Sequence, residues 1–538
     1  MTSTFLGKQI SGCFTIPSGV MTTQISVIER IARDIPEIGI ITTKSVGLYA
    51  RNGYREPVLT QYAPGSFMNA VGLTNPGVEA FAAQLQTLRL PPDRFLLTSI
   101  FGGTIDEFVE VAKRLAPYSD GLELNLSCPH ASGYGMTLGQ NAQLVHDVTH
   151  AVKQAVSIPV IPKLTPNVNN IADIAKAAVQ AGADALCAIN TVGPGYYTYD
   201  GSPVLTNAYG GMSGNGIFPI GLKCVRDIAQ AVDVPLIGCG GVSTAEDVRA
   251  YQQAGASIIG IGSALAGLPS EKLPTYFHAL TTDLRYQTNT ASMLLQNVDM
   301  TFTPYCLSEN RRLAEDLSLL TFDGNLAIQP GQFIFLWLPE VGEKPFSVLD
   351  EQPLTLAIQQ RGCFTKKLCQ LQPGDLVYVR GPYGMSVNIP QNSSPIFVCG
   401  GCGLAAIYPL AKSIQHSTLF VGARDARHLF YLDHAGKIAE LHIATEDGSL
   451  GFQGVITELL DRYLQQRAAG ISPIFFNCGP QAMIATAVEL EQCYTSTENI
   501  YSAIDYVAKC GVGLCGSCSA PDGRRLCVDG PFLKESYM

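Results

Sequence analysis

The sequence lacks the features that would assign it to a membrane, a nucleic acid or the cell exterior. Its longest apolar runs, such as residues 333–338, fall well short of the roughly 18 residues that a spanning helix needs. Acidic residues outnumber basic ones, 45 to 35, whereas nucleic-acid binding depends on basic residues that neutralise phosphate. The N-terminus carries polar Thr2, Ser3, Lys8 and Gln9 and has no apolar stretch typical of a signal peptide. We therefore expect a cytoplasmic protein with neither a membrane nor a nucleic acid as a partner.

Cysteine is plentiful, with 16 residues, and its distribution suggests two uses. Most cysteines are scattered, which indicates reduced thiols rather than a disulfide framework. Near the C-terminus, however, C-x4-C-x2-C and one later Cys form the plant-type ligand spacing of a 2Fe-2S cluster: Cys510, Cys515, Cys518 and Cys527. Zinc also takes four thiolates, but usually from two C-x2-4-C pairs. Because the fourth Cys stands alone, the spacing favours the iron-sulfur cluster.

The 538 residues are too many for one core and predict about three or four domains. Through about residue 270, short β-branched or apolar runs alternate with stretches such as 171–181, where apolar residues recur at helical spacing. The eight runs are residues 13–18, 39–44, 95–100, 121–126, 159–164, 185–190, 235–239 and 257–261. Eight strand and helix units predict a (β/α)8 barrel, over residues 1–290.

Polar or small residues close each of these runs, where a barrel places its chemistry. They are Ser18-Gly19, Lys44, Ser99, Asn125, Lys163, Asn190-Thr191, Gly240-Gly241 and Gly262-Ser263. The paired small residues after the last two runs suit a phosphate site built from backbone amides. We therefore predict a phosphate-bearing cofactor in the barrel, and FMN fits.

Several segments of the barrel resemble class 1 dihydroorotate dehydrogenases. They are NLSCP at 125–129, FMNAVGLTNPG at 67–77, KLTPNV at 163–168, Asn190-Thr191 and GGMSG at 210–214. The resemblance implies that Cys128 is the base that removes the C5 proton while the C6 hydride passes to FMN, and that Lys163 supports charge on the reduced flavin. Further implied flavin or substrate contacts are Lys44, Asn69, Val71, Gly72, Leu73, Asn125, Asn190, Thr191, Ser213 and Gly214.

One loop departs from this pattern and leaves a second substrate class open. His130 stands where the family usually has another substrate-binding Asn, and residues 127–140 (SCPHASGYGMTLGQ) resemble the loop of dihydropyrimidine dehydrogenases, which act on uracil and thymine. In favour of orotate, the counterparts of residues 69–73 bind the orotate carboxylate, and Lys44 would add positive charge. Dihydropyrimidine oxidation remains the alternative.

The second half predicts a reductase. Short strands and turns such as QPG at 329–331 predict a small antiparallel barrel. Lys344-Pro345-Phe346-Ser347 resembles the R-P-x-S flavin motif of ferredoxin-reductase-like proteins, and Gly362 with Thr365 resembles their pyrophosphate turn. The resemblance implies an FAD-binding β-barrel at residues 300–392, although lysine lacks the bidentate phosphate recognition of arginine.

A nucleotide-binding arrangement follows. The apolar run IFVCGGCG at 396–403 enters a glycine-rich turn before a helix-like segment. With TEDGS at 445–449 and NCGP at 477–480, it resembles the NAD-binding lobe of the same reductases. The residues implied are Gly400, Gly401, Gly403, Cys478, Gly479 and Pro480. We expect an NAD-binding domain at residues 393–495 and a 2Fe-2S domain at 496–538.

The order of FAD barrel, NAD lobe and 2Fe-2S loop resembles the electron-transfer subunit of class 1B dihydroorotate dehydrogenase, fused here to its catalytic barrel. The implied electron path runs from dihydroorotate through FMN, the cluster and FAD to NAD, because flavins exchange hydride but pass single electrons to iron-sulfur centres. The family also implies a homodimer through the barrel. An electron-transfer flavoprotein that feeds an external partner is an alternative of another class, against which Cys128 and Lys163 argue.

Overall fold

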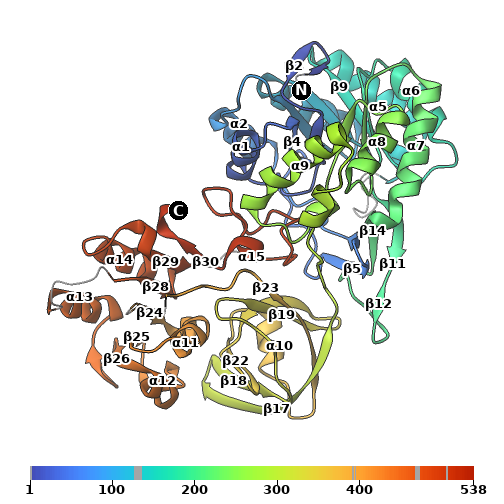
Figure 1. The fold of residues 1–538 in the computed structure, drawn as a ribbon. Coiled ribbons are helices and arrows are strands. Elements are labelled where there is room, and N and C mark those ends of the chain that lie inside the picture. The colour runs from blue at the N-terminus through green and yellow to red at the C-terminus, as the bar shows by residue number, and fades with distance from the viewer. Residues whose placement is uncertain are drawn as a thin grey trace. The chain divides into compact units, whose positions relative to one another are not determined.

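The computed structural model describes residues 3–126, 136–390, 393, 395–466, 473–504 and 507–537. The chain forms two compact units (Figure 1). The first consists of Met1–Met300 with Val512–Arg524, and the second of Thr301–Gly511 with Arg525–Met538. The predicted separate module at 496–538 is therefore divided between the two units.

Eight parallel strands of the first unit close into a barrel in the order β10-β15-β16-β3-β4-β7-β8-β9. They are β3 (Phe14–Ile16), β4 (Ile38–Thr42), β7 (Phe95–Ile100), β8 (Gly121–Asn125), β9 (Val160–Leu164), β10 (Leu186–Ala188), β15 (Leu236–Cys239) and β16 (Ile258–Gly260). The predicted barrel and its eight strands are confirmed, with small differences at strand ends. Buried side chains such as Ile40, Leu97, Ile161 and Ile237 fill the interior, so the barrel is a packed core.

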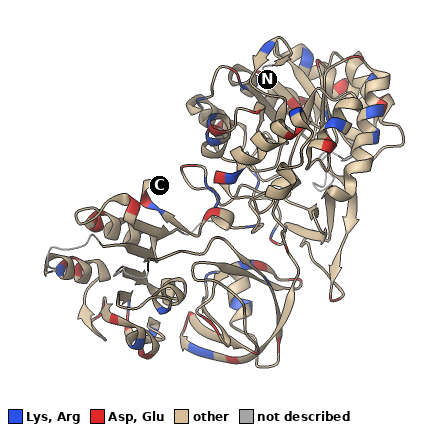
Figure 2. Ribbon diagram, viewed as in Figure 1, with Lys and Arg blue, Asp and Glu red and all other residues tan. Residues whose placement is uncertain are grey.

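Helices follow the strands and surround the barrel (Figure 1). They are α1 (Ile25–Asp34), α2 (Val78–Thr87), α3 (Ile105–Leu115), α4 (Met136–Gln140), α5 (Ala142–Ala155), α6 (Ile171–Gln180), α7 (Phe218–Ala231), α8 (Ala245–Gln253) and α9 (Leu273–Tyr286). Helix α3 shows why these segments form helices against the barrel. Thr104 caps its first turn, and one face of the helix is buried: Phe108, Val111, Ala112 and Leu115. Figure 2 shows Lys, Arg, Asp and Glu interspersed on these helices.

Antiparallel pieces complete the first unit. A hairpin of β1 (Ser3–Phe5) and β2 (Lys8–Ile10) packs Phe5 and Ile10 into the barrel core. A four-stranded sheet contains β11 (Val192–Tyr196), β14 (Tyr209–Gly214), β6 (Ser66–Asn69) and β5 (Leu59–Ala63), and a small hairpin pairs β12 (Thr198–Tyr199) with β13 (Ser202–Pro203). Within the sheet, Asn69 lies opposite Gly211 and Phe67 opposite Ser213. Two motifs far apart in the sequence thus become neighbouring strands.

The second unit begins with a seven-stranded antiparallel sheet. Its strands are β17 (Thr303–Ala314), β18 (Leu317–Phe322), β19 (Phe333–Leu338), β20 (Gly342–Ser347), β21 (Asp350–Glu351), β22 (Leu354–Gln359) and β23 (Leu376–Tyr383), and α10 is Cys363–Leu368. The strand order runs from β20 to β21. Among the described strands, these two ends share no ladder, so the predicted β-barrel is a sheet that wraps its core without full closure.

A second seven-stranded sheet, mostly parallel, has the order β27-β26-β25-β24-β28-β29-β30. Its strands are β24 (Ile396–Gly400), β25 (Ser417–Ala423), β26 (Ala439–Thr445), β27 (Phe452–Gln453), β28 (Phe475–Cys478), β29 (Ile500–Ala503) and β30 (Phe532–Lys534). Its helices are α11 (Leu404–Lys412), α12 (Leu432–Ile438), α13 (Ile456–Gln466), α14 (Gln481–Glu491) and α15 (Leu526–Asp529). Strands β29 and β30, which follow the boundary expected at residue 496, belong to the same sheet as the strands before it. No helix within the described ranges is long and apolar enough to cross a membrane.

Candidate active site and cofactor cavities

A cavity opens where the barrel strands end, and most of the residues predicted from the sequence line it. They are Ser18, Gly19, Lys44, Asn69, Val71, Gly72, Leu73, Asn125, Lys163, Asn190, Thr191, Ser213, Gly214, Gly240, Gly241, Gly262 and Ser263. Ser99 is the exception. Its hydroxyl lies 2.8 Å from the hydroxyl of Ser45, which lines the cavity, and donates to the buried Glu123 carboxylate at 2.9 Å, so Ser99 supports the site without lining it.

Ser45 joins the ends of several strands, a role that the sequence did not reveal. Its hydroxyl lies 2.9 Å from the Ser18 hydroxyl and accepts a hydrogen bond of 3.0 Å from the Asn125 amide. The side-chain oxygen Oδ1 of Asn125 in turn accepts a 3.2 Å hydrogen bond from the side-chain nitrogen of Asn190. The two amides are therefore held in fixed orientations, as recognition of a planar ring with several donors and acceptors requires.

Lys163 and Glu123 form a buried ion pair beside these amides. The Lys163 Nζ lies 3.8 Å from Glu123 Oε1, and the two side chains are 6% and 1% exposed. Burial alone lowers the pKa of Lys163, but Glu123 and the neighbouring thiols raise it above the ordinary lysine value. Lys163 is therefore a cation at neutral pH, placed where it can stabilise negative charge in the cavity.

Two asparagines outside the predicted set shape the cavity loops. The side-chain oxygen Oδ1 of Asn75 accepts a 2.9 Å hydrogen bond from the backbone amide of Gly77. The side-chain nitrogen Nδ2 donates to the Leu73 carbonyl, also at 2.9 Å. Asn167 donates to the Thr191 carbonyl at 3.2 Å. Both asparagines lie inside motifs already noted for resemblance, which was the available signal. They hold the predicted substrate loops in place.

The glycine wall of the cavity fits a phosphate-bearing cofactor such as FMN. Gly241 has φ of +77°, and a Cβ on it would lie 2.8 Å from the Gly214 carbonyl oxygen. Only glycine leaves backbone and space open at this point. Nearby hydroxyls of Ser213 and Ser263 and the cation of Lys163 supply partners suited to an anionic flavin.

The predicted base, Cys128, and the divergent His130 lie outside the described residues. Their roles remain predictions from the sequence.

The second unit contains a cavity of about 1020 Å³, large enough for dinucleotide cofactors. Its lining includes these predicted residues: Lys344, Pro345, Phe346, Ser347, Thr365, Gly400, Gly401, Gly403, Cys478, Gly479 and Pro480. Gly362 is not part of the lining and is instead the N-cap residue of α10, where its amide donates to the Thr365 hydroxyl at 3.1 Å. Arg361, Arg424 and His428 also line the cavity, and the last two had no local motif to mark them.

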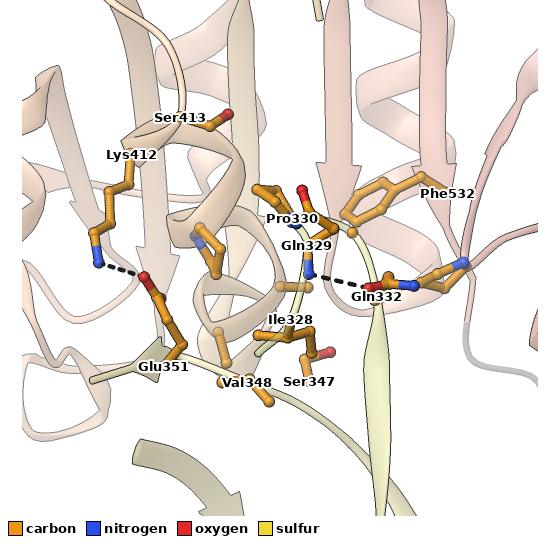
Figure 3. Close-up of a pocket in the computed structure, with 15 residues that line it drawn as sticks. Ile328, Gln329, Pro330, Gln332, Ser347, Val348, Glu351, Lys412, Ser413 and Phe532 are labelled. Carbon is orange, nitrogen blue, oxygen red and sulfur yellow. Dashed lines mark hydrogen bonds and ion pairs between the residues drawn. The ribbon is translucent and has the colours of Figure 1, made fainter. Parts of the chain in front are cut away.

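A smaller cavity of about 240 Å³ lies beside α11 (Figure 3). Lys412 pairs with Glu351 at 3.1 Å, and the Gln329 amide donates to Gln332 at 3.0 Å. Residues that line both cavities are Ser347, Ala405, Ala406 and Pro531. The two cavities are therefore adjacent.

The four predicted cluster ligands are all buried, each 7% exposed or less. Cys515 and Cys518 belong to the first unit, and Cys510 and Cys527 to the second. Within the part of the chain that the structure describes, no group of three or more His, Cys, Asp or Glu is arranged to hold a metal ion. No disulfide joins any of the cysteines in this described part of the chain.

Next to Cys510, the second unit buries an arginine completely. The Arg380 Nη1 donates to the Cys510 carbonyl at 3.0 Å, while Nη2 donates to Glu343 Oε2 at 2.7 Å. The guanidinium carbon lies 4.1 Å from the centre of the Phe335 ring. The Glu343 carboxylate compensates the buried charge, and the arginine fixes the backbone at Cys510.

We expect Glu343→Gln to lower the free energy of unfolding by about 3–5 kcal/mol, because it leaves the buried Arg380 cation uncompensated. Chemical denaturation of the purified protein measures this. The control Glu309→Gln, at an exposed position of β17, should change stability by no more than about 0.5 kcal/mol. Equal stability of the two variants would contradict the importance of the buried pair.

A closed (β/α)8 barrel whose strand ends gather amides, a lysine cation and a glycine wall defines a flavin-dependent barrel oxidoreductase. Residues 1–272 match the family model "Dihydroorotate dehydrogenase". The chain belongs to the dihydroorotate dehydrogenase family.

Curated relatives support this membership. The chain is 46% identical over 254 residues to the catalytic subunit of dihydroorotate dehydrogenase B (NAD(+)) from Methanocaldococcus jannaschii, covering 46% of this chain and 82% of the relative. It is 43% identical over 260 residues to the subunit of the same name from Pyrococcus abyssi, covering 48% and 85%. Both are catalytic subunits, and their matches span about half of this chain.

Two solved structures show partial likeness. A DHODH from Eimeria tenella in complex with ferulenol is 17% identical with a TM-score of 0.45, and the match covers 55% of this chain and 87% of that one. An NADH-dependent reduced ferredoxin-NADP oxidoreductase is 26% identical with a TM-score of 0.39, covering 43% and 88%. Both scores are too low to support a functional comparison.

Proposed function

We propose that this protein oxidises dihydroorotate to orotate in pyrimidine biosynthesis and passes the electrons through FMN, a 2Fe-2S cluster and FAD to NAD. The observation that carries the proposal is the barrel cavity. There Lys163, Asn125 and Asn190 meet at the strand ends in a chain whose barrel belongs to the dihydroorotate dehydrogenase family.

The residues of the barrel divide the work of the oxidation. Asn69, Asn125 and Asn190 bind and orient the pyrimidine ring, and Lys44 adds a positive charge for its carboxylate. The Cys128 thiolate takes the C5 proton, as the NLSCP motif implies. FMN, held by residues such as Ser213, Gly241 and Ser263, would supply the acceptor for the C6 hydride, and loss of this hydride together with the C5 proton would leave a C5–C6 double bond in the product. Lys163 supplies a fixed cation for the negative charge that develops on this side of the cavity.

The second unit supports the onward path of the electrons. The flavin-motif residues from Lys344 to Ser347 and the nucleotide-turn residues Gly400 and Gly479 line one cavity, which suits FAD and NAD side by side. The spacing of the four cysteines supports the cluster. We include in the proposal the fusion of catalytic and electron-transfer parts in one chain, the FAD-binding and NAD-binding divisions of the second unit, and a homodimer through the barrel.

The substrate can be tested by the carboxylate that dihydroorotate has and dihydrouracil lacks. We expect dihydroorotate to bleach the flavin at least about ten- to a hundredfold faster at equal concentration, since losing charge-assisted hydrogen bonds costs about 1.5–3 kcal/mol. Anaerobic stopped-flow absorbance measures both rates. A preference for dihydrouracil would move the protein to the dihydropyrimidine dehydrogenases.

Asn69→Ala should weaken orotate binding while FMN stays bound, because Asn69 lies beside the predicted carboxylate site. Asn170→Ala is the matched control: it removes an amide that caps α6 and donates to Asp173 in the first turn of that helix, and it should leave orotate affinity unchanged. Titration with orotate, followed by flavin absorbance, measures the orotate affinity of both variants.

A further inference from the structure

A segment from far along the chain belongs to the compact unit of the barrel. This segment, Val512–Arg524, is called here the docked loop, and it contains Cys515 and Cys518. The Met21 amide donates to the Leu514 carbonyl at 2.7 Å, and the Gly267 amide donates to the Val512 carbonyl at 2.9 Å. The Thr23 hydroxyl donates to the Cys515 carbonyl at 3.1 Å. The connection between β3 and α1 therefore holds the backbone at Cys515 directly.

Helix α1 and the start of α9 extend the same contact through side chains. The Ser26 hydroxyl donates to the Ala520 carbonyl at 3.1 Å, and Arg30 pairs with Asp522 at 3.2 Å. Arg524 pairs with Glu271, just before α9, at 2.7 Å. Both ion pairs join partly buried arginines, 13% and 11% exposed, so the charges are complementary across the contact.

Glycines let the docked loop come this close. Gly516 has φ of +68°, and a Cβ there would lie 2.5 Å from the Met21 carbonyl oxygen. Gly523 has φ of +84°, and its Cβ would lie 2.6 Å from the Ser26 carbonyl oxygen. Neither position admits a side chain without movement of the barrel backbone, whatever role the glycines also have within the loop.

The opposite side of the β3–α1 connection contacts the cavity. The Lys44 amide donates to the Thr22 carbonyl at 3.0 Å. Lys44 lines the barrel cavity, and so do Leu514 and Cys515 of the docked loop. Residues 22–23 thus stand between a cavity lysine and a predicted cluster ligand.

We propose that the β3–α1 connection and the first turns of α1 are a docking platform, on which Thr23, Ser26 and Arg30 are positioning residues that hold Cys515 at the wall of the flavin cavity. The inference rests on the proposed function and names the residues that position one predicted cluster ligand beside the flavin cavity. The cluster would accept the two electrons from each substrate molecule one at a time, and the docked loop holds Cys515, one of its predicted ligands, against the cavity wall. No further reactant is needed, because NAD takes the electron pair at the end of the path.

Gly523→Ala in the full-length holoenzyme tests the platform, with Gly201→Ala as its matched control. Gly201 has a similar φ of +77° but no atom within 4 Å of its added Cβ, so it carries the same backbone strain without a clash. We expect amide hydrogen exchange at 512–524 to rise about tenfold or more in Gly523→Ala only, which corresponds to 1.4 kcal/mol of lost protection. Ser26→Ala, which removes one hydrogen bond, should shift exchange in the same direction by less.

The functional readout is the rate at which dihydroorotate bleaches the iron-sulfur absorbance. We expect this rate to fall at least about tenfold in Gly523→Ala, while flavin bleaching and iron content match those of Gly201→Ala. Equal exchange and equal cluster bleaching in the two variants would overturn the platform. Loss of iron in Gly523→Ala alone would also overturn it, because the glycine would then serve cluster assembly. If dihydroorotate bleaches no flavin in the unaltered protein, the proposed function fails instead.

Discussion

Replacing Lys163 with alanine is expected to slow flavin reduction by dihydroorotate about 10²- to 10³-fold, because a preorganised cation is lost from the cavity. The same change strands the buried Glu123 carboxylate, which Lys163 faces at 3.8 Å. We therefore also expect a loss of about 3–5 kcal/mol in the free energy of unfolding. Stopped-flow absorbance and chemical denaturation measure the two effects separately.

A double variant, Lys163→Ala with Glu123→Gln, distinguishes charge chemistry from folding. The glutamine is neutral, so most of the lost stability should return, and its carbonyl oxygen can still accept the hydrogen bond from Ser99. Flavin reduction should stay slow. Recovery of the rate together with stability would mean that Lys163 matters only for the fold.

Cys515→Ala should remove the visible iron-sulfur absorbance and abolish dihydroorotate-dependent NAD reduction, since every thiolate ligand is needed to hold the cluster. Dihydroorotate should still bleach FMN, and NADH should still bleach FAD, because the residues proposed for the two flavin sites belong to different units. Iron analysis measures loss of the cluster, and anaerobic absorbance spectra measure the bleaching of each flavin.

The control for this variant is Cys493→Ala, which removes an exposed free thiol and should leave iron and turnover unchanged. NAD-linked turnover that persists in Cys515→Ala without iron would show that electrons reach NAD by a route other than the cluster.

The barrel was predictable because its strands are buried on both faces and read as short apolar runs. The predicted site residues line one cavity for a geometric reason: the C-terminal ends of parallel strands meet at one end of a barrel. The position at a strand end is enough to place these residues in the cavity, without any knowledge of side-chain contacts: Lys44, Asn125 and Lys163.

Residues with distant partners were missed. Glu123 lies inside a strand that reads as apolar, and its importance comes from Lys163 on the next strand. Ser45 is a common residue type whose partners Ser99 and Asn125 are 54 and 80 positions away. Their roles depend on register and orientation between strands, which the local sequence does not encode.

The sequence predicts a ligand loop at the docked loop but gives no sign that this loop belongs to the barrel unit. Its cysteine spacing is a local signal, whereas its contacts with Thr23 and Ser26 span 492 and 494 positions. The open order of the sheet from β20 to β21 was missed for a similar reason, because closure depends on pairing between strands that are not adjacent in the sequence.

The docked loop also constrains the order of events during synthesis. The barrel strands and helices are complete by Met300, but Leu514 and Cys515 of the cavity lining come more than 200 residues later. At about 5–20 residues per second, translation of that stretch takes roughly 10–40 s. During this time the nascent barrel presents its cavity without Leu514 and Cys515, an interval in which a flavin can enter before these two lining residues arrive.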